Sequence, residues 1–291
     1  MERITLSAHA KVNLYLKVMG KRPDGYHDLV TVLQSVSLCD TLHFQKSDRE
    51  GITVDAGGLL PDDERNLVRR AANAYFAASK APFGLAVQLE KRIPMAAGLG
   101  GGSADAAATL RALNLLDGER FSEAELVEIA ATVGADVPFC LVGGTRLCRG
   151  IGERMQPLEN NLGGTLVVAI GGEGVSTPQA FRAMDDLYGD FSGVSDEAPH
   201  ALADAMKKGD LSAAVPHFEN LFEGVVEPLR PAVGECKRLL VAHGAAKAMM
   251  SGSGPSVWGI FENEAAAARA VDALVAAGNR AYLCRMIDPN E

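Results

Sequence analysis

Residues 94–110 of the chain read PMAAGLGGGSADAAATL, the most informative stretch of the sequence. It contains four glycines (Gly98, Gly100, Gly101 and Gly102), and glycine, which lacks a Cβ, can adopt positive φ and lets the backbone come close to a ligand. Ser103 is a favoured helix N-cap, and the alanine-rich residues 104–113 predict a helix. The N–H groups of the loop and the positive end of the helix then converge on one point, which suits an anion and above all a phosphate. An ordinary turn is the weaker interpretation, because so many glycines cost conformational entropy without adding packing.

Two common phosphate-binding motifs are excluded. A Walker loop needs a lysine directly after its last glycine, and none follows these glycines. The dinucleotide fingerprint G-x-G-x-x-G also fails, because its third glycine would fall on Ser103 or Asp105. The sequence therefore predicts a phosphate loop of another class, and a dehydrogenase is disfavoured.

Composition sets the broad class of the protein. The chain has 291 residues, 47% of them hydrophobic and 22% charged, which predicts a globular protein of about two domains. No apolar run is long enough to span a membrane and no secretory leader is apparent, so we expect a cytoplasmic protein. The net charge of −9 argues against nucleic-acid or membrane partners. Five cysteines without a C-x-x-C pair favour reduced thiols over disulfides or zinc.

Local patterns predict a mixture of strands and helices in both halves, an α+β protein. We expect strands at 4–19, 28–44, 84–92, 256–261 and 281–287, and helices at 67–79, 122–133, 229–243 and 264–277. Ser122 and Glu125 have the spacing of a capping box. We expect residues 134–138 to form a sharp loop, 159–164 a connector between domains, and 185–198 an acidic loop.

Three segments resemble the motifs of the GHMP small-molecule kinases: AKVN at 10–13, the glycine segment at 94–104, and SGSGPS at 251–256. The resemblance spans most of the chain. It implies a two-domain architecture, with a ribosomal-protein-S5-like N-terminal domain and a ferredoxin-like α/β C-terminal domain. We assign the ATP-binding kinase domain to residues 1–158 and the substrate-side domain to residues 159–291.

The resemblance also implies a reaction. Residues 8–29 (AHAKVNLYLKVMGKRPDGYHDL), 98–110 and 134–141 (GADVPFCL) are most similar to those members that phosphorylate the 2-hydroxyl of cytidine diphosphate-linked methylerythritol, a small-molecule substrate of the non-mevalonate isoprenoid pathway. The cofactors implied are ATP and Mg²⁺. Phosphoryl transfer needs positioned phosphates, neutralised charge and an oriented nucleophile, which agrees with a glycine loop, a lysine and a carboxylate.

The catalytic residues carried over from the family are Lys11 and Asp136. Lys11 supplies a point charge for a phosphate or a developing alkoxide, and Asp136 orients or deprotonates the attacking hydroxyl. Taken alone, Lys11 would be a solvated lysine on a strand edge and Asp136 a turn residue. Whether Asp136 is a base or a positioning group stays open.

The ATP-binding residues carried over are those of the second motif: Pro94, Met95, Ala96, Ala97, Gly98, Leu99, Gly100, Gly101, Gly102, Ser103 and Ala104. Ser103 is either a metal or phosphate ligand or simply the N-cap of the helix. We expect Asp105, in the first turn, to point away from the phosphates. Ala96 and Ala97 replace glycines of some relatives, which the geometry tolerates where φ is negative. The turn at 251–254 is expected to close against the nucleotide phosphates.

The substrate-binding residues carried over are Asn13, Tyr26, His27 and Phe181. A tyrosine face can stack on cytosine, and an asparagine or imidazole can bond its polar edge. Phe181 is the second aromatic of a cytosine sandwich, although it also fits the apolar face of a helix. Trp258, in the strand after the third motif, has no evident function.

The sequence leaves two alternative functions open. A kinase of the same superfamily acting on homoserine, mevalonate or a sugar has no evident use for Gly25-Tyr26-His27. A non-catalytic nucleotide-binding module on the same fold would need neither Lys11 nor Asp136. The sequence does not indicate the oligomeric state.

Overall fold

The structure is a computed structural model that describes residues 2–48, 51–61, 63–189, 191 and 198–289. The chain forms two compact units, each built from separate segments: unit 1 contains Met1–Ala10, Leu38–Met95 and Gly100–Gly143, and unit 2 contains Lys11–Ser37, Ala96–Leu99 and Gly144–Glu291. This division by contact differs from the continuous domains 1–158 and 159–291, which remain a proposal about function. The strands β1 (Arg3–Lys21) and β2 (His27–Ser47) each contribute to both units.

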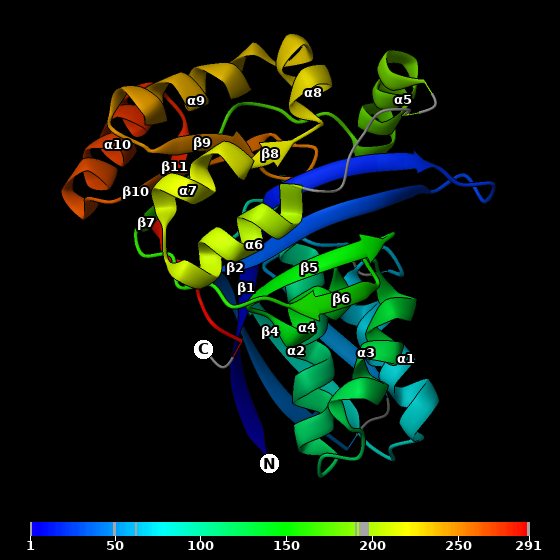
Figure 1. Ribbon diagram of the computed structural model, residues 1–291. Helices are drawn as coiled ribbons and strands as arrows, with labels where there is room; N and C mark the ends of the chain where they lie inside the picture. The colour runs from blue at the N-terminus through cyan, green and yellow to red at the C-terminus, as the bar shows by residue number, and fades with distance from the viewer. Residues whose placement is uncertain (1, 49–50, 62, 190, 192–197, 290–291) are drawn as a thin grey trace. The chain divides into compact units, whose positions relative to one another are not determined.

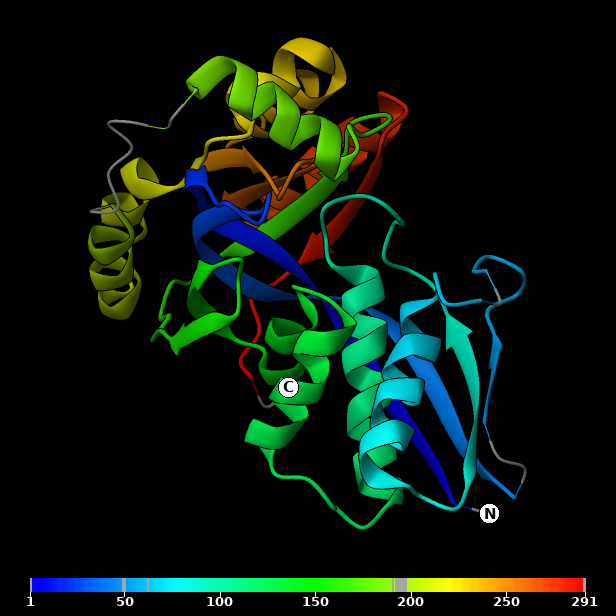
Figure 2. The ribbon, with the colours of Figure 1, turned by 90° about the vertical axis from the view of Figure 1, so that its right-hand side faces the viewer.

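Unit 1 is a sheet covered by helices on one face (Figures 1 and 2). Its further elements are β3 (Ile52–Asp55), α1 (Leu67–Ser79), β4 (Gly84–Glu90), α2 (Gly101–Leu116), α3 (Glu123–Val133) and α4 (Val137–Val142). The strand order is β3-β4-β2-β1, with β4 antiparallel to β2 and parallel to β3. Its core includes the alanines of α2, whose small side chains let the neighbouring helices pack closely around this helix.

Local signals explain where the helices of unit 1 begin. The Asn66 side chain caps α1, and Ser122 and Glu125 form the predicted capping box of α3. The loop expected at 134–138 is shorter than predicted, because Val137 and Pro138 already belong to α4. Proline is well tolerated in the first turn of a helix, where its missing N–H has no carbonyl to bond.

Unit 2 contains a four-stranded antiparallel sheet in the order β11-β7-β10-β9. Its strands are β7 (Thr165–Ile170), β9 (Lys247–Met250), β10 (Ser256–Phe261) and β11 (Arg280–Cys284), and helices α9 (Pro231–Ala242) and α10 (Glu264–Ala276) pack on it (Figure 1). Apart from the elements of residues 177–229, which lie between β7 and α9 in the chain, the succession β7-α9-β9-β10-α10-β11 with this strand order is the expected ferredoxin-like arrangement. The α+β class is therefore confirmed.

The other elements of unit 2 are β5 (Thr145–Gly150), β6 (Arg154–Pro157), α5 (Thr177–Tyr188), α6 (Ala198–Lys208), α7 (Leu211–Ala214), a 3₁₀ turn (Val215–His217), β8 (Glu219–Asn220) and α8 (Glu223–Leu229). The connector predicted at 159–164 has no regular structure. The acidic loop predicted at 185–198 is wrong at its start, because residues 185–188 complete α5; residues 190 and 192–197 lie outside the described residues. All five cysteines are free thiols. Among the described residues, every helix is too short or too polar to cross a membrane.

Candidate active site

Lys11 is buried inside unit 2 beside Asn13. Because side chains alternate along a strand, residues 11 and 13 of β1 share one face, and they are only 5% and 3% exposed. Lys11 Nζ donates a hydrogen bond to Asn13 Oδ1 at 3.0 Å, and Lys11 N donates to Leu99 O at 2.9 Å. A buried ammonium needs hydrogen-bond acceptors. Lys11 is therefore not a solvated lysine on a strand edge, and its ammonium is held in one place.

The Asn13 side chain is held through both its oxygen and its nitrogen. Its Nδ2 donates to Thr31 Oγ1 at 2.9 Å, while Oδ1 accepts from Gly252 N at 2.9 Å as well as from Lys11. These partners fix the orientation of the amide. Within unit 2 the side chain thus joins the first motif to the third, and its direct contact with substrate stays a prediction.

The Asn13 backbone is held as firmly. Its N–H donates to Ser251 Oγ at 3.3 Å, and its carbonyl accepts from Trp258 Nε1 at 2.9 Å. Trp258 is fully buried, and the ring of Phe218 packs against it edge-on. Trp258, which had no evident function in the sequence, therefore supports the strand that carries Lys11.

Residues 96–99 of the glycine segment belong to unit 2 and contact the turn at 251–254. Gly98 has φ +76°, and its carbonyl accepts from Ser251 Oγ at 3.1 Å. A Cβ at Gly98 would lie 2.4 Å from Ser251 O, so only glycine fits there. Ala96 has φ +52°, contrary to the negative φ expected above, and this left-handed conformation is strained for alanine.

Residues 100–104 belong to unit 1 and begin α2. The N-cap is Gly100, with φ +69°, and the helix begins at Gly101, so Ser103 is not the N-cap but a residue of the first turn. By helix geometry the N–H groups of residues 101–103 have no intrahelical partner, which leaves them directed at the space before the helix. Such N–H groups suit an anion, and the binding of a phosphate here stays a prediction.

The remaining residues of the segment differ in exposure. Pro94 and Ala104 are buried, while Met95 is exposed. Asp105 lies just past the first turn and is buried against Lys91, and its direction relative to the phosphates stays a prediction. Gly101 does not have positive φ; it is required because a Cβ would lie 2.8 Å from Ile93 Cγ2.

Asp136 occupies the N-cap position of α4 in unit 1 and is half-buried. Its side chain makes no capping hydrogen bond, whereas its carbonyl accepts from Cys140 N at 3.0 Å. The side chain is therefore not used as the cap of this helix. Since Asp136 and Lys11 belong to different units, their pairing stays a prediction.

The aromatic residues predicted to bind substrate lie in unit 2. Tyr26 is 62% exposed, as expected for a residue after a turn. His27 is buried and stacks on Phe181, with ring centroids 4.5 Å apart and an interplanar angle of 20°. Phe181 therefore covers the face of His27, and a sandwich of cytosine between Tyr26 and Phe181 stays a prediction.

Sequence reasoning missed Asp185, which holds His27 in place. Its Oδ1 lies 2.6 Å from His27 Nε2 and its Oδ2 lies 2.6 Å from Lys21 Nζ. Partial burial disfavours the charged carboxylate most strongly, but the combined effects of Lys21 and His27 outweigh it and lower the pKa of Asp185. The sequence did contain one signal for Asp185. It is four residues from Phe181, so the two residues share one face of α5.

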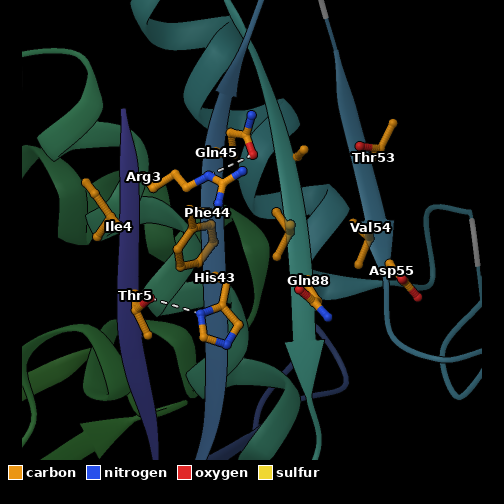
Figure 3. A pocket seen from close by; sticks show the side chains of 12 residues that line it. Arg3, Ile4, Thr5, His43, Phe44, Gln45, Thr53, Val54, Asp55 and Gln88 are labelled. Carbon is orange, nitrogen blue, oxygen red and sulfur yellow. Dashed lines mark hydrogen bonds between the residues drawn. The ribbon is translucent and has the colours of Figure 1, made fainter. Parts of the chain in front are cut away.

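A hollow of about 680 Å³ lies elsewhere, over the sheet of unit 1 (Figure 3). Polar and apolar residues of β1, β2, β3 and β4 line it, with Thr5 hydrogen-bonded to His43 and Arg3 to Gln45. None of its lining residues is among the predicted site residues.

Comparisons with known proteins give a consistent result. Residues 66–144 match the GHMP kinases N terminal domain, and residues 200–280 match the GHMP kinases C terminal domain. A 4-diphosphocytidyl-2-C-methyl-D-erythritol kinase of Synechococcus sp. (strain JA-3-3Ab) is 42% identical, covering 94% of this chain and 90% of the relative. The kinase of the same name from Syntrophus aciditrophicus (strain SB) is 43% identical over 96% of this chain and 98% of the relative.

Solved structures agree in fold. The crystal structure of a 4-(cytidine 5'-diphospho)-2C-methyl-D-erythritol kinase superposes with a TM-score of 0.80 at 36% identity, covering 97% of this chain and 99% of the other. A homoserine kinase from Cytophaga hutchinsonii superposes with a TM-score of 0.76 at 20% identity, covering 99% of this chain and 98% of the other, which is a likeness of fold alone.

Proposed function

Since the chain belongs to the GHMP kinases and, among them, to the 4-diphosphocytidyl-2-C-methyl-D-erythritol kinase family, we propose that it transfers the γ-phosphoryl group of ATP to the 2-hydroxyl of 4-diphosphocytidyl-2-C-methyl-D-erythritol. The observation that carries the proposal is the buried Lys11–Asn13 pair, whose partners are the glycine segment and the turn at 251–254. A lysine held in this way suits phosphoryl transfer, in which catalysis depends on positioning and charge stabilisation.

The proposed mechanism assigns each group one task. The N–H groups at the start of α2 bind the phosphates of ATP, and Lys11 neutralises charge on the transferring group or on the acceptor oxygen. Asp136 orients the acceptor hydroxyl and takes its proton. A bond forms between the acceptor oxygen and the γ-phosphorus, the bond from that phosphorus to the bridging oxygen breaks, and ADP leaves.

Mg²⁺ fits the donors that the chain offers, because Ser103 places a hydroxyl, a hard oxygen ligand, in the first turn of α2. The ion, when bound, neutralises phosphate charge. Tyr26, His27, Phe181 and Asn13 are proposed to bind the cytidyl substrate. We further propose a cytoplasmic location, which the free thiols favour.

A coupled assay of ADP release tests the substrate. With Mg·ATP, the purified protein should phosphorylate the cytidyl substrate and act poorly on unlinked methylerythritol, because binding energy from the remote nucleotide positions the reacting hydroxyl. Homoserine and mevalonate serve as competing acceptors. Equal turnover of either one would overturn the substrate assignment, and no turnover of any acceptor would favour a nucleotide-binding module.

Tyr26→Ala tests the base-binding role. Stacking on a base contributes about 1–3 kcal/mol in nucleic-acid sites, so KM for the cytidyl substrate should rise roughly 5- to 150-fold, with KM for ATP nearly unchanged. Because Tyr26 is exposed, the variant should fold normally. Tyr26→Phe keeps the ring and should have a mild effect. An unaltered KM for the cytidyl substrate in Tyr26→Ala would show that the ring does not contact the base.

A further inference from the structure

A cluster of buried charges lies in unit 1 where the chain enters and leaves the glycine segment. Lys91 follows β4, Asp40 belongs to β2 and Asp105 to α2, and the three side chains are 6%, 0% and 1% exposed. Lys91 Nζ lies 2.5 Å from Asp40 Oδ2 and 2.8 Å from Asp105 Oδ2. Lys91 therefore ties the stretch before the segment to the helix after it.

The cluster also holds the backbone next to the segment. Asp40 Oδ1 accepts hydrogen bonds from Arg92 N at 2.5 Å and from Ile93 N at 2.8 Å. The side chain of Ile93 packs so closely against Gly101, the first residue of α2, that no Cβ fits there. The position of residues 92–93 is thus coupled to the first turn of the helix.

The charges of the cluster do not balance. Two carboxylates share one ammonium, and among the described residues Asp105 Oδ1 has no hydrogen-bond partner. Burial and the neighbouring Asp40 raise the pKa of Asp105 to about 7, against the opposing effect of Lys91. A buried ion cluster adds little stability over apolar packing, so its presence here points to a need for defined geometry.

We propose that Asp105, acting through Lys91 and Asp40, is a positioning residue that sets the first turn of α2 against residues 92–93 and thereby aligns the N–H groups that bind phosphate. This inference rests on the proposed function, because it assumes that ATP binds at this helix terminus.

The experiment compares Asp105→Ala with Asp105→Asn. Alanine removes the hydrogen bond from Lys91 to Asp105 on α2. KM for ATP should therefore rise about tenfold, the effect of losing one charge-assisted hydrogen bond. The kcat at saturating ATP and the KM for the acceptor should stay within about twofold of the parent. Asparagine keeps an oxygen that accepts from Lys91, and its KM for ATP should stay within about threefold of the parent.

Asp117→Ala is the matched control on the same helix. Asp117 is the C-cap of α2, and its carboxylate accepts from Tyr75 and Arg120 at 3.1 and 2.7 Å, so its loss also removes a mostly buried carboxylate tie without touching the glycine segment. Its KM for ATP should not change. An equal rise of KM in both alanine variants would reduce the effect to general destabilisation and overturn the proposal.

Hydrogen exchange separates this proposal from the proposed function, because it requires no activity. In Asp105→Ala, the hydrogen-bonded amides of Arg92, Ile93 and Ala104 should exchange at least about tenfold faster than in the parent, and in Asp117→Ala they should not. If the parent protein lacks kinase activity, the proposed function fails while the exchange result still decides the positioning role. Unchanged exchange in Asp105→Ala overturns the inference.

Discussion

Replacing Lys11 by methionine should lower kcat roughly 10²-fold or more, with little change in KM for ATP, because the lysine acts on charge that develops during transfer. Methionine preserves most of the buried volume, and Asn13 Oδ1 keeps the hydrogen bond from Gly252 N, so the site should retain its shape.

Asp136→Asn should lower kcat by a similar factor if the carboxylate takes the proton of the acceptor hydroxyl. Steady-state kinetics with both substrates varied measure the effect.

Lys17→Met is the control for the replacement of Lys11. Lys17 lies on the same strand and is also mostly buried, but it pairs with Glu219 at 3.0 Å instead of Asn13. Its kcat should stay close to that of the parent. A similar loss in Lys17→Met would mean that β1 merely needs its lysines to fold. Near-native kcat in Asp136→Asn would leave Asp136 as a turn residue.

Features encoded by neighbouring residues can be predicted from the sequence. Local patterns predict the bounds of α1 and β10 to the residue, and Ser122 and Glu125 alone predict the capping box of α3. These features depend on local backbone preferences and apolar periodicity, which a single sequence displays. The α+β class follows from the same patterns.

The contacts that hold the site could not be predicted, because they join distant parts of the chain. Asn13 bonds Gly252 and Trp258 across more than 230 residues, and Asp40 bonds Ile93 across 53. Such pairs depend on strand register and on which unit each segment joins. The error at Ser103 has a local cause: Gly100 takes the left-handed conformation and begins the helix earlier than a serine cap would.

Gly98→Ala should be the most damaging change in the glycine segment. The left-handed conformation at φ +76° costs an alanine about 1–2 kcal/mol, and the new Cβ would lie 2.4 Å from Ser251 O, which adds about 1–3 kcal/mol of overpacking. We therefore expect the free energy of unfolding to fall by about 2–5 kcal/mol. The new Cβ would push the loops at 98 and 251 apart. Lys11 N donates to Leu99 O in the first loop and Asn13 Oδ1 accepts from Gly252 N in the second, so the separation would displace both residues. We expect kcat/KM to fall about 10²-fold, the effect of misplacing a catalytic group by about 1 Å.

Gly118→Ala distinguishes the two causes. Gly118 has φ +74°, but among the described residues no atom beyond Gly118 and its two chain neighbours lies within 4 Å of the position that a Cβ would take there. This variant therefore carries the backbone strain without the collision. It should lose about 1–2 kcal/mol of unfolding free energy in chemical denaturation and keep its kcat. The difference between the two alanine variants then measures the contact between the loops at 98 and 251. An equal loss of unfolding free energy in both variants would mean that the loops can accommodate a Cβ at residue 98. Gly98 would then be needed only for its backbone conformation.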